Sequence, residues 1–194
     1  ILHTQSPLLL LGSPPCTMFS QMINISKNKH KDPEKETRLI QQGESLLCTA
    51  MDLYTEQHRR GDIFLHEHPA NATSWRHPKV EAVATLPGVQ IVTGDMCMWG
   101  LTTTTHHDPD QVGFAKKPTK WMTNCPQLAE TLSRKCDGSH HHEVLEGGNR
   151  CRLAQSYPID LTRAILKTLQ TVKRKGQWSK QSTKVNVVEN PLEP

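Results

Sequence analysis

A cysteine at the tip of a proline-stiffened turn is the strongest chemical signal in this sequence. The segment Gly12–Ser20 reads GSPPCTMFS and follows the apolar run Pro7–Leu11. The run predicts a buried strand, and the segment after it predicts a turn. Because Pro14 and Pro15 fix their φ angles and donate no backbone hydrogen bond, the turn should hold the Cys16 thiol in one direction. Such a turn can carry a nucleophile, although a buried cysteine that only closes the turn would give the same pattern.

An acidic residue follows a second predicted strand in the same way. Ile63–Leu65 is apolar and runs directly into HEHP at 66–69. If the strands before Cys16 and Glu67 are parallel neighbours, both side chains lie at one edge of the sheet. A thiolate that adds to an electron-poor ring needs a nearby acid to take up the developing negative charge. The pair therefore predicts covalent catalysis, with a solvated loop carboxylate as the alternative for Glu67.

A group of cysteines and histidines near residue 140 has the residue types of a metal site. Cys136, His140, His142 and Cys151 are spaced C-x3-H-x-H-x8-C. Zinc takes four nitrogen or sulfur ligands in a tetrahedron, and two close pairs on a loop can supply them. The spacing differs from the common zinc-finger patterns, so a polar loop with solvated histidines is the alternative.

Basic residues accompany a predicted strand in the second half of the chain. Lys116, Lys117 and Lys120 precede Trp121. The lysines could contact phosphates while the indole stacks on a base. Lys117 and Lys120 are therefore candidate substrate-binding residues, and a basic strand that arises by chance is the alternative.

Strands alternate with helices along the chain, which predicts an α/β domain with a largely parallel sheet. The expected strands are Pro7–Leu11, Ile63–Leu65, Val89–Thr93 and Thr119–Thr123. The expected helices are Glu34–Arg60, Pro78–Ala84, Pro126–Arg134 and Asp160–Lys173. The first strand is the most apolar, so we expect it to be central. We expect this domain to cover residues 1–174 and a disordered tail to cover 175–194.

Composition narrows the class of protein. The 194 residues suffice for one domain with a core, and a net charge of +4 permits a nucleic-acid partner without requiring one. Six cysteines without a scaffold pattern indicate reduced thiols in an intracellular protein, nuclear or cytoplasmic. The run Leu8–Leu11 is too short for a membrane span and lacks a basic flank, so we expect neither a membrane segment nor a signal peptide. The start at Ile1, directly before a strand, suggests a fragment of a longer protein.

The cysteine turn resembles the Pro-Cys motif of the DNA (cytosine-5) methyltransferases, which reads roughly G-x-P-P-C-Q-x-F-S. The strand–helix–strand that follows ends in FLHEHP at 64–69, which resembles that family's Glu-Asn-Val/Pro motif. GDMCMWG at 94–100 resembles the segment that leads to the family's tyrosine-glycine turn. The resemblance covers residues 7–101 and, more faintly, 117–135.

The resemblance implies a Rossmann-like class I methyltransferase sheet that is incomplete at its N-terminal, cofactor-binding half. It implies that Cys16 attacks C6 of a cytosine flipped out of DNA, and that Glu67 engages N3 and the amino group of the base. Pro15 would help to shape the loop, Pro15 and Ser20 would be substrate-binding residues, and S-adenosylmethionine would supply the methyl group. Because the family's glycine-rich cofactor loop precedes the Pro-Cys motif, we expect this chain to be inactive alone.

Two other functions stay open. One is a non-catalytic module of a mobile-element (retroelement-type) polyprotein that binds nucleic acid or protein, because degenerate domains of this kind are similar to such modules. The other is a small zinc-binding interaction domain built on residues 136–151. The methyltransferase hypothesis requires Cys16 and Glu67 at the same end of adjacent parallel strands.

Overall fold

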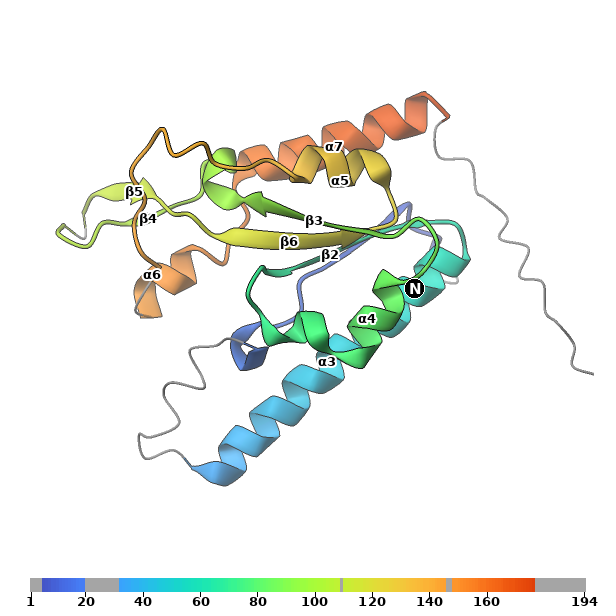
Figure 1. Cartoon of the computed structure of the whole chain (residues 1–194), viewed down its shortest axis with the longest axis horizontal. Coiled ribbons are helices and arrows are strands. Elements are labelled where there is room, and N and C mark those ends of the chain that lie inside the picture. The colour runs from blue at the N-terminus through green and yellow to red at the C-terminus, as the bar shows by residue number, and fades with distance from the viewer. Residues whose placement is uncertain (1–4, 20–31, 109, 146–147, 177–194) are drawn as a thin grey trace, which may run out of the picture.

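A computed structural model of the chain describes residues 5–19, 32–108, 110–145 and 148–176. Within these ranges, helices cover both faces of a four-stranded sheet, with α3 and α4 on one side and α5 and α7 on the other (Figure 1). The expected tail from residue 175 lies almost wholly outside the described residues. No helix within these ranges is long and apolar enough to span a bilayer.

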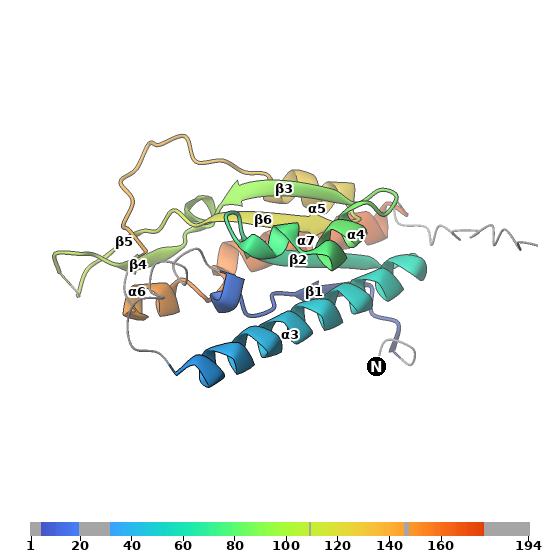
Figure 2. The same cartoon turned by 60° about the horizontal axis from the view of Figure 1, so that its bottom comes forward.

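The sheet is mixed. Its strands are β1 (Leu9–Gly12), β2 (Ile63–Pro69), β6 (Pro118–Thr123) and β3 (Gln90–Asp95), in the order β1-β2-β6-β3. The α/β class is confirmed, but the prediction that neighbouring strands pair mostly in parallel is wrong. The β1–β2 pair is parallel, whereas β6 runs antiparallel to both β2 and β3. The prediction of a central first strand is also wrong, because β1 lies at the edge of the described sheet, beside α3 (Figure 2).

The antiparallel pairing of β6 follows from its connection to β3. After β3 the chain passes through a 3-10 turn, η4 (Met96–Trp99), and a hairpin of β4 (Thr102–Thr104) and β5 (Val112–Phe114). A parallel pairing would need a crossover over one face of the sheet. The hairpin instead returns the chain to the end of the sheet that it left, so β6 must run backwards between β2 and β3.

The expected helices are confirmed to within two residues at each end. They are α3 (Pro33–Arg59), α4 (Pro78–Ala84), α5 (Pro126–Leu132) and α7 (Ile159–Arg174). The Asp32 side chain caps α3 by accepting hydrogen bonds from the first free N–H groups, and Gly61 follows its end with φ of 72°. Two short elements, η3 (Thr73–Arg76) and α6 (Gly148–Leu153), complete the structure with η1 (Thr17–Phe19).

Successive residues of β2 alternate between the two faces of the sheet. Phe64 packs in the core with Leu47 and Met122 beneath α3 and α4. Ile63 and Leu65 pack in the opposite core beneath α5 and α7. The same alternation places His66 and His68 on the α3 face and Glu67 on the α7 face, which sets the site described next.

Candidate functional site

The cysteine turn and Glu67 lie at the same edge of the sheet. Gly12 at the end of β1 pairs with His66 of the parallel strand β2, and Cys16 follows in the turn beyond. The expected placement at the carboxyl ends of adjacent parallel strands is therefore confirmed. Strand β2 extends to Pro69, four residues further than predicted, and Glu67 is only 2% exposed. The alternative of a solvated loop carboxylate is therefore wrong.

Two hydrogen bonds fix the cysteine turn to β2. The Ser13 hydroxyl donates a hydrogen bond to Oε2 of Glu67. Nε2 of His68 lies 2.8 Å from the carbonyl oxygen of Pro14, to which it donates. The other ring nitrogen, Nδ1, lies 2.6 Å from the Ser74 hydroxyl, which then donates to it. Burial lowers the pKa of His68, although the Pro14 carbonyl opposes this, so the ring is neutral and keeps this one tautomer.

A lysine directly before β6, the strand that pairs with the other edge of β2 from β1, supplies the counter-charge to Glu67. Nζ of Lys117 lies 3.6 Å from Oε1 of Glu67, and the two side chains are 18% and 3% exposed. The separation exceeds a hydrogen bond, and Oε1 has no hydrogen-bond partner among the described residues. Lys117 also donates to the carbonyl oxygen of Ala154, 3.4 Å away. The sequence indicated Lys117 only as a phosphate contact, and its pairing with Glu67 became visible through the fold.

The Cys16 thiol is half-buried in this environment. Burial raises its pKa, Lys117 lowers it, and the negative charge of Glu67 raises it again. In the free protein the thiol is therefore protonated at neutral pH. Two tyrosines flank the same carboxylate: burial first, and then Glu67, raises the pKa of both Tyr54 and Tyr157, so both hydroxyls stay protonated.

The other residues that the sequence suggested for substrate binding differ in their surroundings. Pro15 is exposed beside Cys16, and Ser20 lies outside the described residues. Lys120 extends over the ring of Trp75, with Nζ 5.6 Å from its centroid. Trp121 is fully buried in the α7-side core, so the expected stacking on a base is wrong.

His66 is a buried histidine whose ring nitrogens have no hydrogen-bond partner among the described residues. Its ring lies between those of Tyr54, His68 and Trp75, with centroids 5.0 to 5.5 Å away. Burial, and to a lesser extent His68, lowers its pKa to about 3. The ring is therefore a neutral member of the α3-side core.

Acid should destabilise the protein through His66. The unfolded chain binds a proton at this residue with a pKa of about 6.5, so folding loses free energy as pH falls from there toward the pKa of the folded state. We expect the free energy of unfolding at pH 5 to be about 2 kcal/mol below its pH 7 value through this group alone. Urea unfolding at both pH values should show this loss reduced in His66→Leu and unchanged in His107→Leu, an exposed control. Equal losses in both variants would contradict the prediction.

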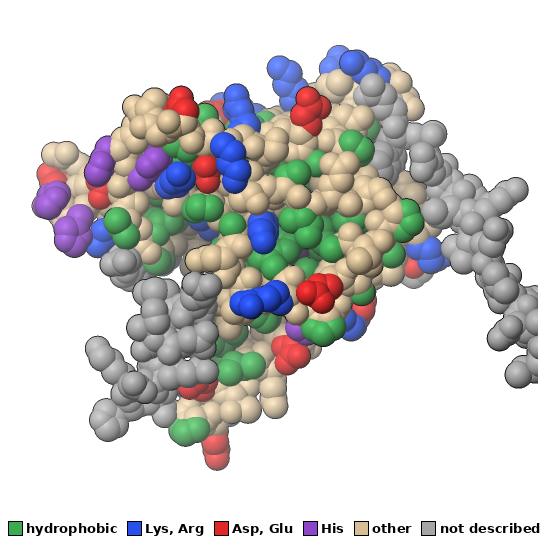
Figure 3. Space-filling view, viewed as in Figure 1, with side chains coloured by type: hydrophobic (Ala, Val, Ile, Leu, Met, Phe, Trp, Pro, Cys, Tyr) green, Lys and Arg blue, Asp and Glu red, His purple; other side chains and the backbone are tan. Residues whose placement is uncertain are grey.

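A second cluster lies at the end of the molecule that carries β4 and β5, where histidine side chains gather (Figure 3). Cys97, Cys136, His140 and His142 each place one ligand atom within 4.8 Å of the others. Cys97 lies in η4 and is buried, and the other three come from the segment after α5. Burial, with a hydrogen bond to Cys136, raises the pKa of Cys97 to about 11.

The structure brings together three of the four metal ligands expected from sequence, but not Cys151. That thiol is exposed and donates to the carbonyl oxygen of Leu145, 3.2 Å away. Cys97 takes its place in the cluster. Spacing along the chain could not reveal Cys97, because the pairing of β3 with β6 and the packing of α5 bring η4 to the loop.

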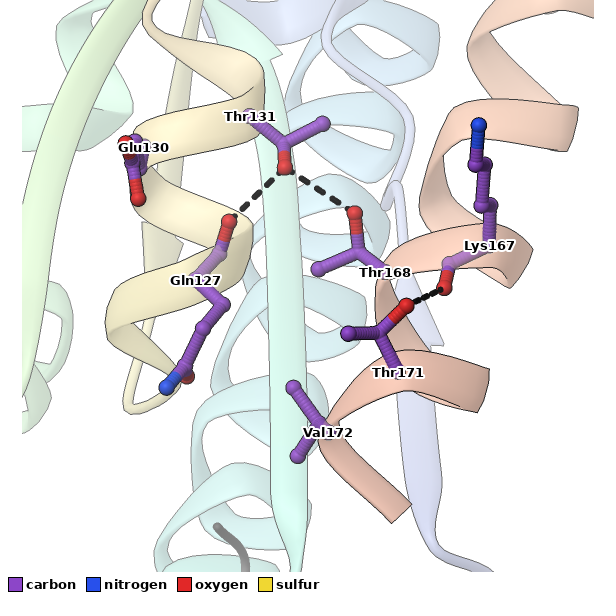
Figure 4. Close-up of a pocket in the computed structure, with 7 residues that line it drawn as sticks. All are labelled: Gln127, Glu130, Thr131, Lys167, Thr168, Thr171 and Val172. Atoms are coloured by element: carbon purple, nitrogen blue, oxygen red, sulfur yellow. Dashed lines mark hydrogen bonds between the residues drawn. The ribbon is translucent and has the colours of Figure 1, made fainter. Parts of the chain in front are cut away.

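A groove between α5 and α7 is lined by polar side chains (Figure 4). The Thr131 hydroxyl bridges the Gln127 carbonyl at 2.8 Å and the Thr168 hydroxyl at 2.9 Å, and Thr171 donates to the Lys167 carbonyl. These hydroxyls are satisfied by the helices themselves. The groove is therefore a helix-packing seam.

Comparison of the chain with known proteins found no match. No protein-family model matches the chain, and no curated protein or solved structure is significantly similar to it. The residues and their geometry are therefore the basis on which a function can be proposed.

Proposed function

We propose that the chain is the catalytic half of a cytosine-5 methyltransferase-like domain, in which Cys16 adds to C6 of a cytosine in DNA and Glu67 engages the same base. The observation that carries the proposal is the attachment of the cysteine turn to β2. Ser13 contacts Glu67, and Pro14 contacts His68, so the turn that carries the thiol after β1 is held against the parallel strand that carries the acid.

The strand order supports the same proposal. In the described sheet β1, β2 and β3 point one way, and the last strand, β6, is inserted antiparallel between β2 and β3. This is the arrangement expected for the second half of a class I methyltransferase sheet. The cofactor-binding strands of such a sheet would lie beyond β1.

S-adenosylmethionine does not fit the residues described here. Gly12 ends β1 directly before the cysteine turn, and even a Cβ added there would meet the Tyr54 hydroxyl. The space against Gly12 is therefore filled by the protein's own side chain. We assign no residue of this chain to that cofactor and derive no step through it.

The chemistry open to the chain is reversible addition to the pyrimidine ring. Deprotonation of Cys16 gives a thiolate that forms a bond to C6, while N3 takes up a proton and C5 becomes nucleophilic. C5 then takes a proton from water and loses the hydrogen it carried before. N3 gives up the proton it had taken, the thiolate is eliminated and protonated again, and the aromatic ring is restored. Hydrogen at C5 is exchanged with solvent, and every atom and electron is accounted for without a co-reactant.

Exchange at C5 therefore tests the proposal. Deuterium at C5 of an unpaired cytosine in DNA should be lost to water in the presence of the chain, as measured by mass spectrometry. Cys16→Ser should reduce the rate to background, and Glu67→Gln should reduce it by about 100-fold or more, the typical share of a positioned acid. Cys48→Ser, which changes a half-buried thiol on α3, should leave the rate unchanged. Exchange that persists in Cys16→Ser would overturn the proposal.

A second candidate is a non-catalytic nucleic-acid-binding module that keeps the fold. Two observations favour this binding function. The Cys16 thiol is protonated in the free protein, and Glu67 is already in contact with Lys117 and Ser13, so neither group is ready to react. DNA binding with no exchange at C5, equal in the wild type and in Cys16→Ser, would establish this function instead.

A further inference from the structure

We propose that the chain binds one Zn²⁺ ion through Cys97, Cys136, His140 and His142. This inference is independent of the proposed chemistry at Cys16. Its ligand atoms are the two thiolate sulfurs and Nε2 of each histidine, a Cys₂His₂ set of the kind that holds structural zinc.

The distances within the cluster match a tetrahedral zinc site. Sγ of Cys136 lies 3.7 Å from Nε2 of His140 and 3.4 Å from Nε2 of His142. A tetrahedron with Zn–S bonds of about 2.3 Å and Zn–N bonds of about 2.1 Å separates sulfur from nitrogen by about 3.6 Å. Cys136 and the two histidines are therefore already placed as a metal ion would require, and Cys97, which is distant in sequence, brings its sulfur to within 4.8 Å of their ligand atoms.

Neighbouring groups orient the ligands. The backbone N–H of Gly138 donates to Sγ of Cys136 at 3.3 Å, in a turn that Gly138 allows with φ of 80°. The buried carboxylate of Asp95 accepts the backbone N–H of Cys136 at 2.9 Å. The His140 ring packs on Phe114, with centroids 4.5 Å apart. Outer contacts of this kind hold ligand side chains in place at metal sites.

The site explains how an irregular segment is held on the sheet. Residues 135–145, all of them described, form no helix or strand beyond a single bridge between Glu143 and Ala115. A metal ion would bind this segment to η4, directly after β3. Four protein ligands complete a tetrahedron, so the ion would be structural, with no position left for a substrate.

Metal analysis of the purified chain tests the inference. Elemental analysis should find about one zinc ion per chain, and replacement by Co²⁺ should give the visible absorption of a tetrahedral site with sulfur ligands. Cys97→Ser should lower zinc affinity, in competition with a chromogenic chelator, by more than the roughly 10–100-fold typical of an outer-sphere change. Cys151→Ser is the matched control, because this exposed thiol lies outside the cluster, and it should keep both the zinc and the Co²⁺ spectrum.

A pair of substitutions at one ligand keeps the test decisive if Cys97→Ser fails to fold. His142→Cys retains four nitrogen or sulfur ligands and should still bind about one zinc ion, whereas His142→Ala should not. Either of two results would overturn the proposal: a folded wild-type chain that binds no zinc, or zinc binding that survives Cys97→Ser and is lost in Cys151→Ser.

Discussion

Lys117→Met should lower the free energy of unfolding by about 3–5 kcal/mol at neutral pH, the range seen when one partner of a buried ion pair is removed. Methionine fills a similar volume but cannot compensate the Glu67 carboxylate, whose side chain is 3% exposed. Oε1 already lacks a hydrogen-bond partner among the described residues, so no neighbour there is placed to replace the lost cation. Urea unfolding monitored by circular dichroism measures the loss.

The double variant Lys117→Met, Glu67→Gln separates this electrostatic cost from a loss of packing. Removing the second charge should restore most of the stability, because a neutral amide carries a much smaller burial penalty than an uncompensated carboxylate. Lys120→Met is a control at a neighbouring lysine whose ammonium lies over Trp75, and it should cost about 1 kcal/mol. Additive losses in the double variant would show that the 3.6 Å contact carries no coupling.

The same ion pair bears on the proposed nucleophile. Lys117 lowers the pKa of Cys16, whereas burial and Glu67 raise it. In a variant that remains folded, loss of the cation should therefore raise the thiol pKa and slow alkylation at Cys16. The fold thus couples two properties, because the cation that neutralises the buried acid is also the one that favours the thiolate.

Much of this site could be predicted from local sequence, because its signals are local. The apolar run, the two prolines and the cysteine lie within a few residues of each other, so the turn at Cys16 was visible directly. The apolar spacing that buries Leu47, Met51 and Tyr54 on one face also fixed the long helix α3. The period of a helix is visible in the sequence without knowledge of tertiary contacts, so the four expected helices agree closely with α3, α4, α5 and α7, whereas the short α6 was not predicted.

What could not be predicted depends on long-range pairing. Strand β2 continues through HEHP because β6 pairs with its backbone and the Ser13–Pro14 turn makes hydrogen bonds to Glu67 and His68, so residues that look like a loop are buried. Cys97 joins the histidines only because β3 packs against the end of α5. The direction of β6 depends on a hairpin whose two strands have three residues each, too short for a periodic signal.

Gly94→Ala should be among the most damaging small substitutions in the chain. An added Cβ would lie 2.2 Å from the carbonyl oxygen of Leu132 and 3.2 Å from that of Arg134, and both are backbone atoms that no rotamer change can move. Either β3 or the end of α5 must shift, which breaks the hydrogen bond from the Asp95 N–H to the Arg134 carbonyl, now 2.8 Å long. We expect a loss of about 3 kcal/mol or more, at the upper end of what overpacking costs.

Gly88→Ala isolates the contribution of the close contact. Gly88 has φ of 75° and nothing within 4 Å of an added Cβ, so alanine there costs only the left-handed backbone strain, about 1–2 kcal/mol. Because only Lys135 separates Arg134 from Cys136, Gly94→Ala should also weaken zinc binding, whereas Gly88→Ala should not. Equal destabilisation by the two substitutions, with zinc affinity unchanged in both, would mean that α5 does not hold the metal-binding segment against β3.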